Sequence, residues 1–133
     1  MPSFKTGDSA EFSKTITEAD IVLYAGITGD TNPLHLNAEY AAGTRFGERI
    51  AHGMLTAGLI SAVIGTKLPG PGAIYMSQTL DFKGPVHIGD TITATGTIID
   101  YDGARGPMAL QTACTNQRGE TILSGEAKIL YRP

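Results

Sequence analysis

The sequence predicts an α+β protein in which an antiparallel sheet is wrapped around one long central helix. The segment Gly53–Lys67 is compatible with a helix and is apolar on nearly every side, which indicates burial all round. After it come alternating apolar and polar runs separated by turn residues, as in antiparallel strands. A sheet with one apolar face must bury that face, and an apolar helix must be surrounded by other residues. Packing the sheet around the helix therefore buries both apolar surfaces.

Local signals define the elements that precede the long helix. Residues Ser9–Ile16 alternate loosely and predict a short strand. Thr17 and Asp20 form a capping-box pattern. Apolar residues at helical spacing then predict a helix over Glu18–Thr28, with Gly29 as its stop. A second, short helix is expected over Ala38–Thr44, capped by Asn37.

Turn residues divide the second half of the chain. The segment Leu68–Gly72 contains two prolines and two glycines, so it ends the long helix and forms a turn. Strands are expected at Ala73–Phe82, Thr91–Asp100, Pro107–Asn116 and Thr121–Tyr131, with turns at His87–Asp90, Gly103–Gly106 and Gln117–Glu120.

Length and composition predict one folded domain over residues 1–133. Hydrophobic residues make up 41% of the chain and charged residues 17%, which predicts a packed core. The net charge of −3 and the lack of a basic run argue against a nucleic-acid partner. A few local lysines or arginines can still hold the phosphates of an anionic ligand on an acidic protein.

The sequence shows no pattern typical of membrane insertion or secretion. The apolar stretch Gly53–Leu68 is too short and too interrupted to span a bilayer. The polar residues Met1–Phe12 lack a basic start followed by an apolar run, so we expect a cytoplasmic location. Cys114 is the one cysteine and lies in an alternating run, which predicts a buried strand residue rather than a nucleophile.

The segment Gly29–Leu36 (GDTNPLHL) carries the strongest signal for chemistry. It places a carboxylate, Asp30, and an imidazole, His35, five residues apart after a helix. Pro33 fixes its own φ and pushes Asn32 toward an extended conformation, so the loop can hold both groups at a set separation for acid–base catalysis. From the spacing alone the alternative is structural, with Asp30 capping the next turn and His35 a surface or core histidine.

A second cluster, Ala51–Met54 (AHGM), lies at the start of the long helix. The first amides of a helix have no partner inside it, so the Gly53 N–H is available to a developing oxyanion. His52 is either a second candidate base or a histidine that packs at the helix start. Ser61 either faces the pocket or bonds to its own helix. Three scattered histidines and one cysteine give no metal-ligand spacing, so no metal site is expected.

Taken together, these motifs resemble a known family. The runs GDTNPLHL, IAHGMLTAGLISAVIGTKLPGPGAIY and LDFKGPVHIGD, in this order, are similar to the MaoC-like (R)-specific enoyl-CoA hydratases, a hot-dog-fold family. The likeness spans nearly the whole chain, and D-x-N-P-x-H followed by H-G-M is far more specific than either motif alone. It implies an acyl-CoA substrate, a homodimer whose sheets join edge to edge, and a role in fatty acid metabolism that supplies polyhydroxyalkanoate precursors.

The resemblance also implies a mechanism. Water would attack the β-carbon of a trans-2-enoyl thioester while charge develops on the carbonyl oxygen, which the Gly53 amide would stabilise. His35 suits the base that takes the water proton, and Asp30 would return a proton to the α-carbon, which requires a protonated and hence buried carboxyl. The two roles could be exchanged. Coenzyme A is part of the substrate, so no separate cofactor is expected.

Further residues are assigned to substrate binding. Asn32 and Ser61 match polar positions that line or support the site in the family, and His52 is counted with them. The acyl tail is expected to run along the long helix, where bulky residues such as Ile64 would close the tunnel early and favour short chains.

Three other functions are compatible with this fold. A hot-dog thioesterase would attack the carbonyl carbon, but such enzymes usually lack the D-x-N-P-x-H loop. A dehydratase acting on acyl-carrier-protein substrates would use the same residues in reverse. A non-catalytic acyl-CoA binding module would have no reason to place Asp30 and His35 together.

Overall fold

The computed structural model of the protein describes residues 3–103 and 105–133. These residues form one antiparallel sheet of six strands, in the order β1-β4-β5-β6-β2, with β3 also paired to β6. The strands are β1 (Ser9–Thr15), β2 (Ala73–Gln78), β3 (Asp81–Phe82), β4 (Thr91–Tyr101), β5 (Gly106–Thr115) and β6 (Thr121–Tyr131). The helices are α1 (Glu18–Thr28), α2 (Pro33–Leu36), α3 (Ala38–Ala42) and α4 (Gly53–Thr66).

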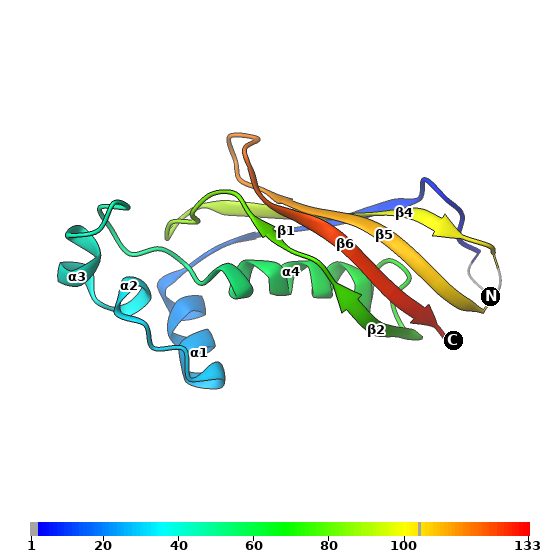
Figure 1. Cartoon of the computed structure of the whole chain (residues 1–133), viewed down its shortest axis with the longest axis horizontal. Coiled ribbons are helices and arrows are strands. Elements are labelled where there is room, and N and C mark those ends of the chain that lie inside the picture. Colours follow the sequence, from blue (N-terminus) through cyan, green and yellow to red (C-terminus); the bar gives the residue numbers. More distant parts are fainter. Residues whose placement is uncertain (1–2, 104) are drawn as a thin grey trace.

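Helix α4 lies along one face of the curved sheet, and α1, α2 and α3 gather beyond one end of it (Figure 1). Residues of β4 alternate between buried and partly exposed, as in a sheet with one face on the core. The core lies between α4 and the sheet and includes Ile60, Val63, Ile64, Ile92, Leu110 and Leu123. The predicted architecture, an antiparallel sheet around a long helix, is confirmed.

The helix caps that the sequence predicts are also present. The Asp20 amide donates to Thr17 Oγ1 over 3.2 Å, and the Thr17 amide donates to an Asp20 carboxylate oxygen over 2.9 Å. Gly29 ends α1 with a φ of 81°, in the left-handed region that glycine adopts without strain. Asn37 caps α3 by accepting a hydrogen bond from the Tyr40 amide. Local sequence therefore sets where α1 and α3 begin.

The prediction that the long helix is buried on every side is wrong. The sheet covers only one face of α4, on which the buried residues are Thr56, Ile60, Val63 and Ile64. Gly58, Ser61 and Gly65 lie on the opposite, exposed face. Within the described part of the chain, nothing lies within 4 Å of a Cβ built at Gly58 or Gly65, so neither glycine is needed for a close approach of another backbone.

Two other elements differ from the prediction. The strand expected over Ala73–Phe82 is divided into β2 and β3. Between them the Thr79 backbone lies so close to Gly125 of β6 that a Cβ there would collide with the Thr79 carbonyl. The stiff segment after α1 contains a further helix, α2, which begins with Pro33 and is capped by Asn32.

Other expectations concern single positions and the chain ends. Cys114 is fully buried in β5, where burial raises the pKa of its thiol to about 12, so the predicted buried strand residue is confirmed. None of the helices in the described residues combines the length and hydropathy needed to cross a membrane. The turn expected at Gly103–Gly106 and the stretch Met1–Phe12 both include residues that lie outside the described ones.

Candidate active site

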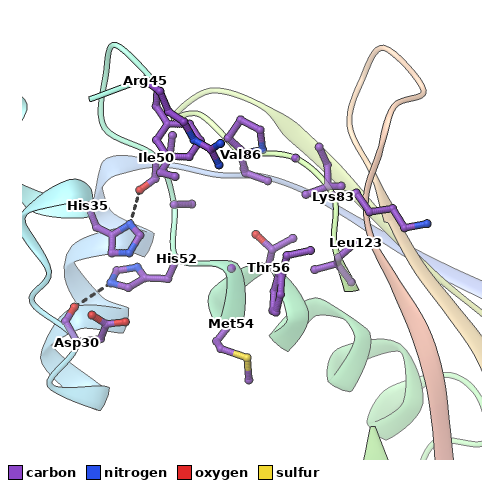
Figure 2. Close-up of a pocket in the computed structure, with 17 residues that line it drawn as sticks. Asp30, His35, Arg45, Ile50, His52, Met54, Thr56, Lys83, Val86 and Leu123 are labelled. Carbon is purple, nitrogen blue, oxygen red and sulfur yellow. Dashed lines mark hydrogen bonds between the residues drawn. The ribbon is translucent and has the colours of Figure 1, made fainter. Parts of the chain in front are cut away.

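A cavity of about 700 Å³ lies where the segment after α1 meets the start of α4 (Figure 2). Its polar wall includes Asp30, His35, His52, Gly53 and Thr56. Its apolar wall includes Ile50, Phe82, Val86, Ile122 and Leu123. The cavity therefore combines titratable groups, a helix N-terminus and an apolar surface, which is the usual composition of a small-molecule site.

The loop that carries Asp30 is held by its own side chains. The Asp30 amide donates to Thr28 Oγ1, and the Asn32 amide donates to Asp30 Oδ1 over 3.4 Å. Asn32 Oδ1 in turn accepts a hydrogen bond from the Leu34 amide over 3.0 Å and so caps α2. Asn32 thus supports the loop, but it is not among the described residues that line the cavity.

The His35 ring is buried and oriented by a backbone carbonyl. Its Nδ1 lies 2.8 Å from the carbonyl oxygen of Ile50. Because a carbonyl only accepts, Nδ1 carries the hydrogen in the neutral ring and Nε2 keeps a free lone pair. Arg49 fixes the backbone of the same residue, since its Nε donates to the His35 carbonyl over 2.7 Å while its Nη1 pairs with Glu18 over 2.8 Å. The geometry therefore prepares His35 Nε2 as a proton acceptor.

His52 joins the loop to helix α4. Its Nε2 lies 2.9 Å from the Asp30 carbonyl oxygen, so in the neutral ring this nitrogen donates and Nδ1 is an acceptor. The ring centroid lies 4.0 Å from that of His35 and 4.6 Å from that of Tyr24. The residue is only 1% exposed and ties Asp30 to the helix start, as expected of a histidine that packs there, while its alternative role as a base stays a prediction.

Gly53 is the first residue of α4, and its lack of a side chain has a steric reason. A Cβ at this position would lie 2.7 Å from Cε1 of the Phe82 ring, which comes from β3. The ring thus covers the start of the helix at a distance that only glycine allows. The first amides of α4 have no partner within the helix, so the Gly53 N–H is open to a ligand in the cavity.

The structure brings Asp30, His35, His52 and Gly53 together at the cavity, whereas three predicted binding residues, Asn32, Ser61 and Ile64, are not part of its described lining. Ser61 is on the exposed face of α4, and Ile64 is 1% exposed in the core. The roles of these three residues in substrate binding therefore stay predictions. The carboxyl of Asp30 is exposed in this chain, contrary to the burial expected of a proton donor.

Sequence reasoning did not identify several residues of the cavity, including Thr56, Phe82, Arg45 and Lys83. In the sequence, α4 and β2 lie between Gly53 and the residues Phe82 and Lys83, so only the tertiary fold brings them close. Thr56 could have been identified from the sequence, because it is a polar residue on the face of an otherwise apolar helix that packs against the core.

Two of the histidines that are scattered in the sequence, His35 and His52, lie close together in the structure. Ligand atoms of Asp30, His35 and His52 lie within 4.8 Å of one another, so these are the described residues that could hold a metal ion. The planes of the two rings are tilted by 30° from each other, with centroids 4.0 Å apart. The expected lack of a metal site stays a prediction.

Comparisons with known proteins agree with this geometry. The family model described as MaoC like domain matches residues 3–115. The (R)-specific enoyl-CoA hydratase of Rhodospirillum rubrum is 53% identical over 95% of this chain and 87% of that protein. The 3-hydroxybutyryl-CoA dehydratase of Methylorubrum extorquens is 52% identical over 87% of this chain and 73% of that protein. The solved structure of the (R)-hydratase from Aeromonas caviae involved in PHA biosynthesis has a TM-score of 0.92 at 38% identity, over 96% of this chain and 97% of that one. This likeness confirms the hot-dog fold.

We predict that Gly53 and Phe82 are energetically coupled. In a helix, alanine is ordinarily favoured over glycine by about 1 kcal/mol. The contact with the ring should cancel this gain, so Gly53→Ala should leave the free energy of unfolding nearly unchanged in the native background and raise it by about 1 kcal/mol in a Phe82→Ala background. Urea unfolding of both single variants and the double variant measures the coupling, which we expect to be about 1 kcal/mol. Additive effects would contradict the steric role of the glycine.

Proposed function

The chain belongs to the family of MaoC-like domains, and we propose that it catalyses the reversible, (R)-specific hydration of trans-2-enoyl-CoA to (R)-3-hydroxyacyl-CoA. Its close relatives are named as hydratase and dehydratase, both hydro-lyase activities, and the protein is an enzyme of this class. One observation carries the proposal: Asp30 and His35 lie within reach of one water molecule beside the first amides of α4. The predicted cytoplasmic location is kept as part of the proposal.

The proposed reaction begins at His35. Its Nε2 has the free lone pair because Nδ1 donates to Ile50, so it takes a proton from the attacking water. The water oxygen bonds to C3 of the enoyl group, and the electron pair of the C2–C3 double bond moves onto the thioester carbonyl oxygen. The Gly53 amide donates to this oxygen; one such donor is worth about 3 kcal/mol in other enzymes. Only water and the thioester are consumed, so the proposal includes no resident cofactor or metal.

Asp30 completes the addition in this proposal. It starts as the neutral acid. One of its oxygens accepts a hydrogen bond from the second hydrogen of the water, which stays in the new hydroxyl, and its own proton goes to C2 as the electron pair returns from the oxygen. The proton that His35 took from the water then restores the acid form of Asp30. The carboxyl is exposed in the chain alone, but a thioester seated in the cavity would cover it and favour its neutral form. Because the pair holds one water on one side, hydrogen and hydroxyl add to the same face of the double bond.

We predict that Asp30→Asn and His35→Ala each lower kcat by about 10²-fold or more, the usual effect of removing a positioned acid or base. The measurement is the loss of enoyl absorbance when crotonyl-CoA is mixed with purified protein, followed by chiral chromatography of the product. His87→Ala, at a turn outside the described cavity lining, is the matched control and should keep full turnover.

Several results would contradict this proposal in different ways. Near-normal kcat in either variant would remove that residue from the mechanism. An (S)-product would contradict the stereochemistry. Release of free thiol without loss of the double bond would indicate a thioesterase, and tight binding of crotonyl-CoA with no reaction would indicate a non-catalytic module.

The choice of coenzyme A as the carrier is supported by charge at the cavity. Among the described lining residues, Arg45 and Lys83 are the only charged side chains besides Asp30, if the histidines are neutral. Both lie away from Asp30 in the close-up view (Figure 2). The cavity of this acidic protein is therefore cationic on the side opposite the reacting groups, which fits the phosphates of a nucleotide-bearing thioester.

We predict that Arg45→Ala combined with Lys83→Ala raises KM for crotonyl-CoA about tenfold, the loss of about 1.4 kcal/mol of binding. KM for crotonyl-pantetheine, which has the thioester but no phosphate, should not change. Lys128→Ala, on the exposed part of β6, serves as the control. Equal effects on both substrates would contradict phosphate recognition. Preference of the native enzyme for a crotonyl group on acyl-carrier protein would instead favour the dehydratase alternative.

The proposal includes a homodimer joined through β2. This strand is an edge of the sheet and exposes large apolar side chains, with Met76 exposed by 64% and Ile74 by 47%. The neighbouring Tyr75 is also exposed, by 38%, and adds an uncharged aromatic ring to this edge. An open apolar edge strand is a template for another chain, and a second copy can cover it across a two-fold axis.

We predict a dimer in light scattering at micromolar concentration, and a shift toward monomer for Met76→Lys. Ile99→Lys is the matched control, because Ile99 is an exposed apolar residue on β4, away from this edge, and it should leave the mass unchanged. A stable native monomer would exclude the dimer, and dissociation caused equally by both variants would exclude β2 as the interface.

A further inference from the structure

Two buried polar side-chain atoms of the described residues make no hydrogen bond within the protein: Nδ1 of His52 and Oγ1 of Thr56. Both residues line the cavity, and Thr56 is 0% exposed. Buried hydroxyl groups are nearly always paired, because leaving one unpaired lowers the stability of the fold. An unpaired hydroxyl in the wall of a reaction cavity therefore calls for a partner from the ligand.

The other helical threonines show that the Thr56 hydroxyl is unusual. In a helix, a threonine hydroxyl commonly donates to the carbonyl four residues earlier. Thr28 does so to Tyr24 over 2.8 Å, and Thr66 of α4 does so to Ala62 over 2.6 Å. Thr56 has the same option toward His52 but does not take it, and that carbonyl accepts backbone amides instead.

The position of Thr56 on α4 directs its side chain to the helix start. Residues three and four apart lie on the same face of a helix, so Thr56 shares a face with Gly53 and His52. Helical side chains lean toward the N-terminus, which places the hydroxyl over the first turn. In Figure 2 the Thr56 side chain lies beside the start of α4, and the residue is part of the cavity wall. Gly53, whose amide has no partner within the helix, lines the same cavity.

The two unpaired atoms differ in what they can offer a ligand. Nε2 of His52 donates to the Asp30 carbonyl, so Nδ1 of the neutral ring has only a lone pair. The Thr56 hydroxyl has a proton to give. Of the two, only Thr56 can therefore bind an oxygen on which negative charge develops.

We propose that Thr56 Oγ1–H donates a second hydrogen bond to the thioester carbonyl oxygen, beside the bond from the Gly53 amide. This inference rests on the proposed function. As the double bond electrons move onto that oxygen during addition of water, both donors strengthen, so the hydroxyl lowers the barrier more than it aids substrate binding. Thr56 is then a catalytic residue, and the unpaired hydroxyl of the free enzyme is prepared for the transition state.

The test compares Thr56→Val, which keeps the shape and removes the hydroxyl, with Thr56→Ser, which keeps the hydroxyl. With crotonyl-CoA we expect Thr56→Val to lower kcat by about 10²-fold with little change in KM, as removal of one oxyanion donor does. Thr56→Ser should recover most of the turnover. The melting temperature of Thr56→Val should be equal or higher, because the unpaired buried hydroxyl is gone. Thr66→Val, which removes a hydroxyl bonded to the helix, should leave kcat unchanged.

A spectroscopic readout tests contact with the carbonyl itself. Butyryl-CoA labelled with ¹³C at the carbonyl has no double bond to hydrate, so its C=O stretch can be recorded in the bound state by infrared spectroscopy. Two donors should lower this frequency more in the native enzyme than in Thr56→Val. Unchanged kcat in Thr56→Val would overturn the proposal, and so would lower kcat with an unchanged C=O frequency. A native enzyme that does not hydrate crotonyl-CoA would instead overturn the proposed function.

Discussion

The site depends on the hydrogen bonds between the segment that precedes α4 and the loop that follows α1. Ile50 accepts from His35, Arg49 donates to the carbonyl of His35, and His52 donates to the carbonyl of Asp30. These bonds fix which ring nitrogens carry hydrogen and bring the loop to the N-terminus of α4. If they were lost, Asp30 and His35 would lie on a loop with no fixed relation to Gly53, and no common point would exist where water and thioester could meet.

Features that depend on near neighbours in the chain could be predicted from the sequence. The capping box of Thr17 and Asp20, the left-handed stop at Gly29 and the alternation of the strands are local, and the structure contains them. The open face of α4 was missed because glycine and serine have too little surface to indicate which side of a helix is covered. Where one predicted strand divides into β2 and β3, Thr79 contacts Gly125, and these two residues are far apart in sequence.

The residues of the candidate site also divide into those set by near neighbours in the sequence and those that only the fold brings together. Asp30 and His35 share one short segment, so their grouping could be predicted, and Gly53 followed from the helix start. Phe82 belongs to the site only because β3 pairs with β6 and brings the ring to α4. The sequence shows Thr56 as a polar residue on an apolar helix, but only the structure shows that its hydroxyl is unpaired.

The burial of Cys114 gives the molecule an internal reporter of its own motions. It is the sole cysteine of the chain, and its thiol lies between β5 and α4, 3.7 Å from the carbonyl oxygen of Thr56. Because burial raises the pKa of this thiol to about 12, a thiol reagent can reach a reactive form only when the helix separates from the sheet. The rate of modification under native conditions therefore measures how often the N-terminal end of α4 opens, without any engineered label.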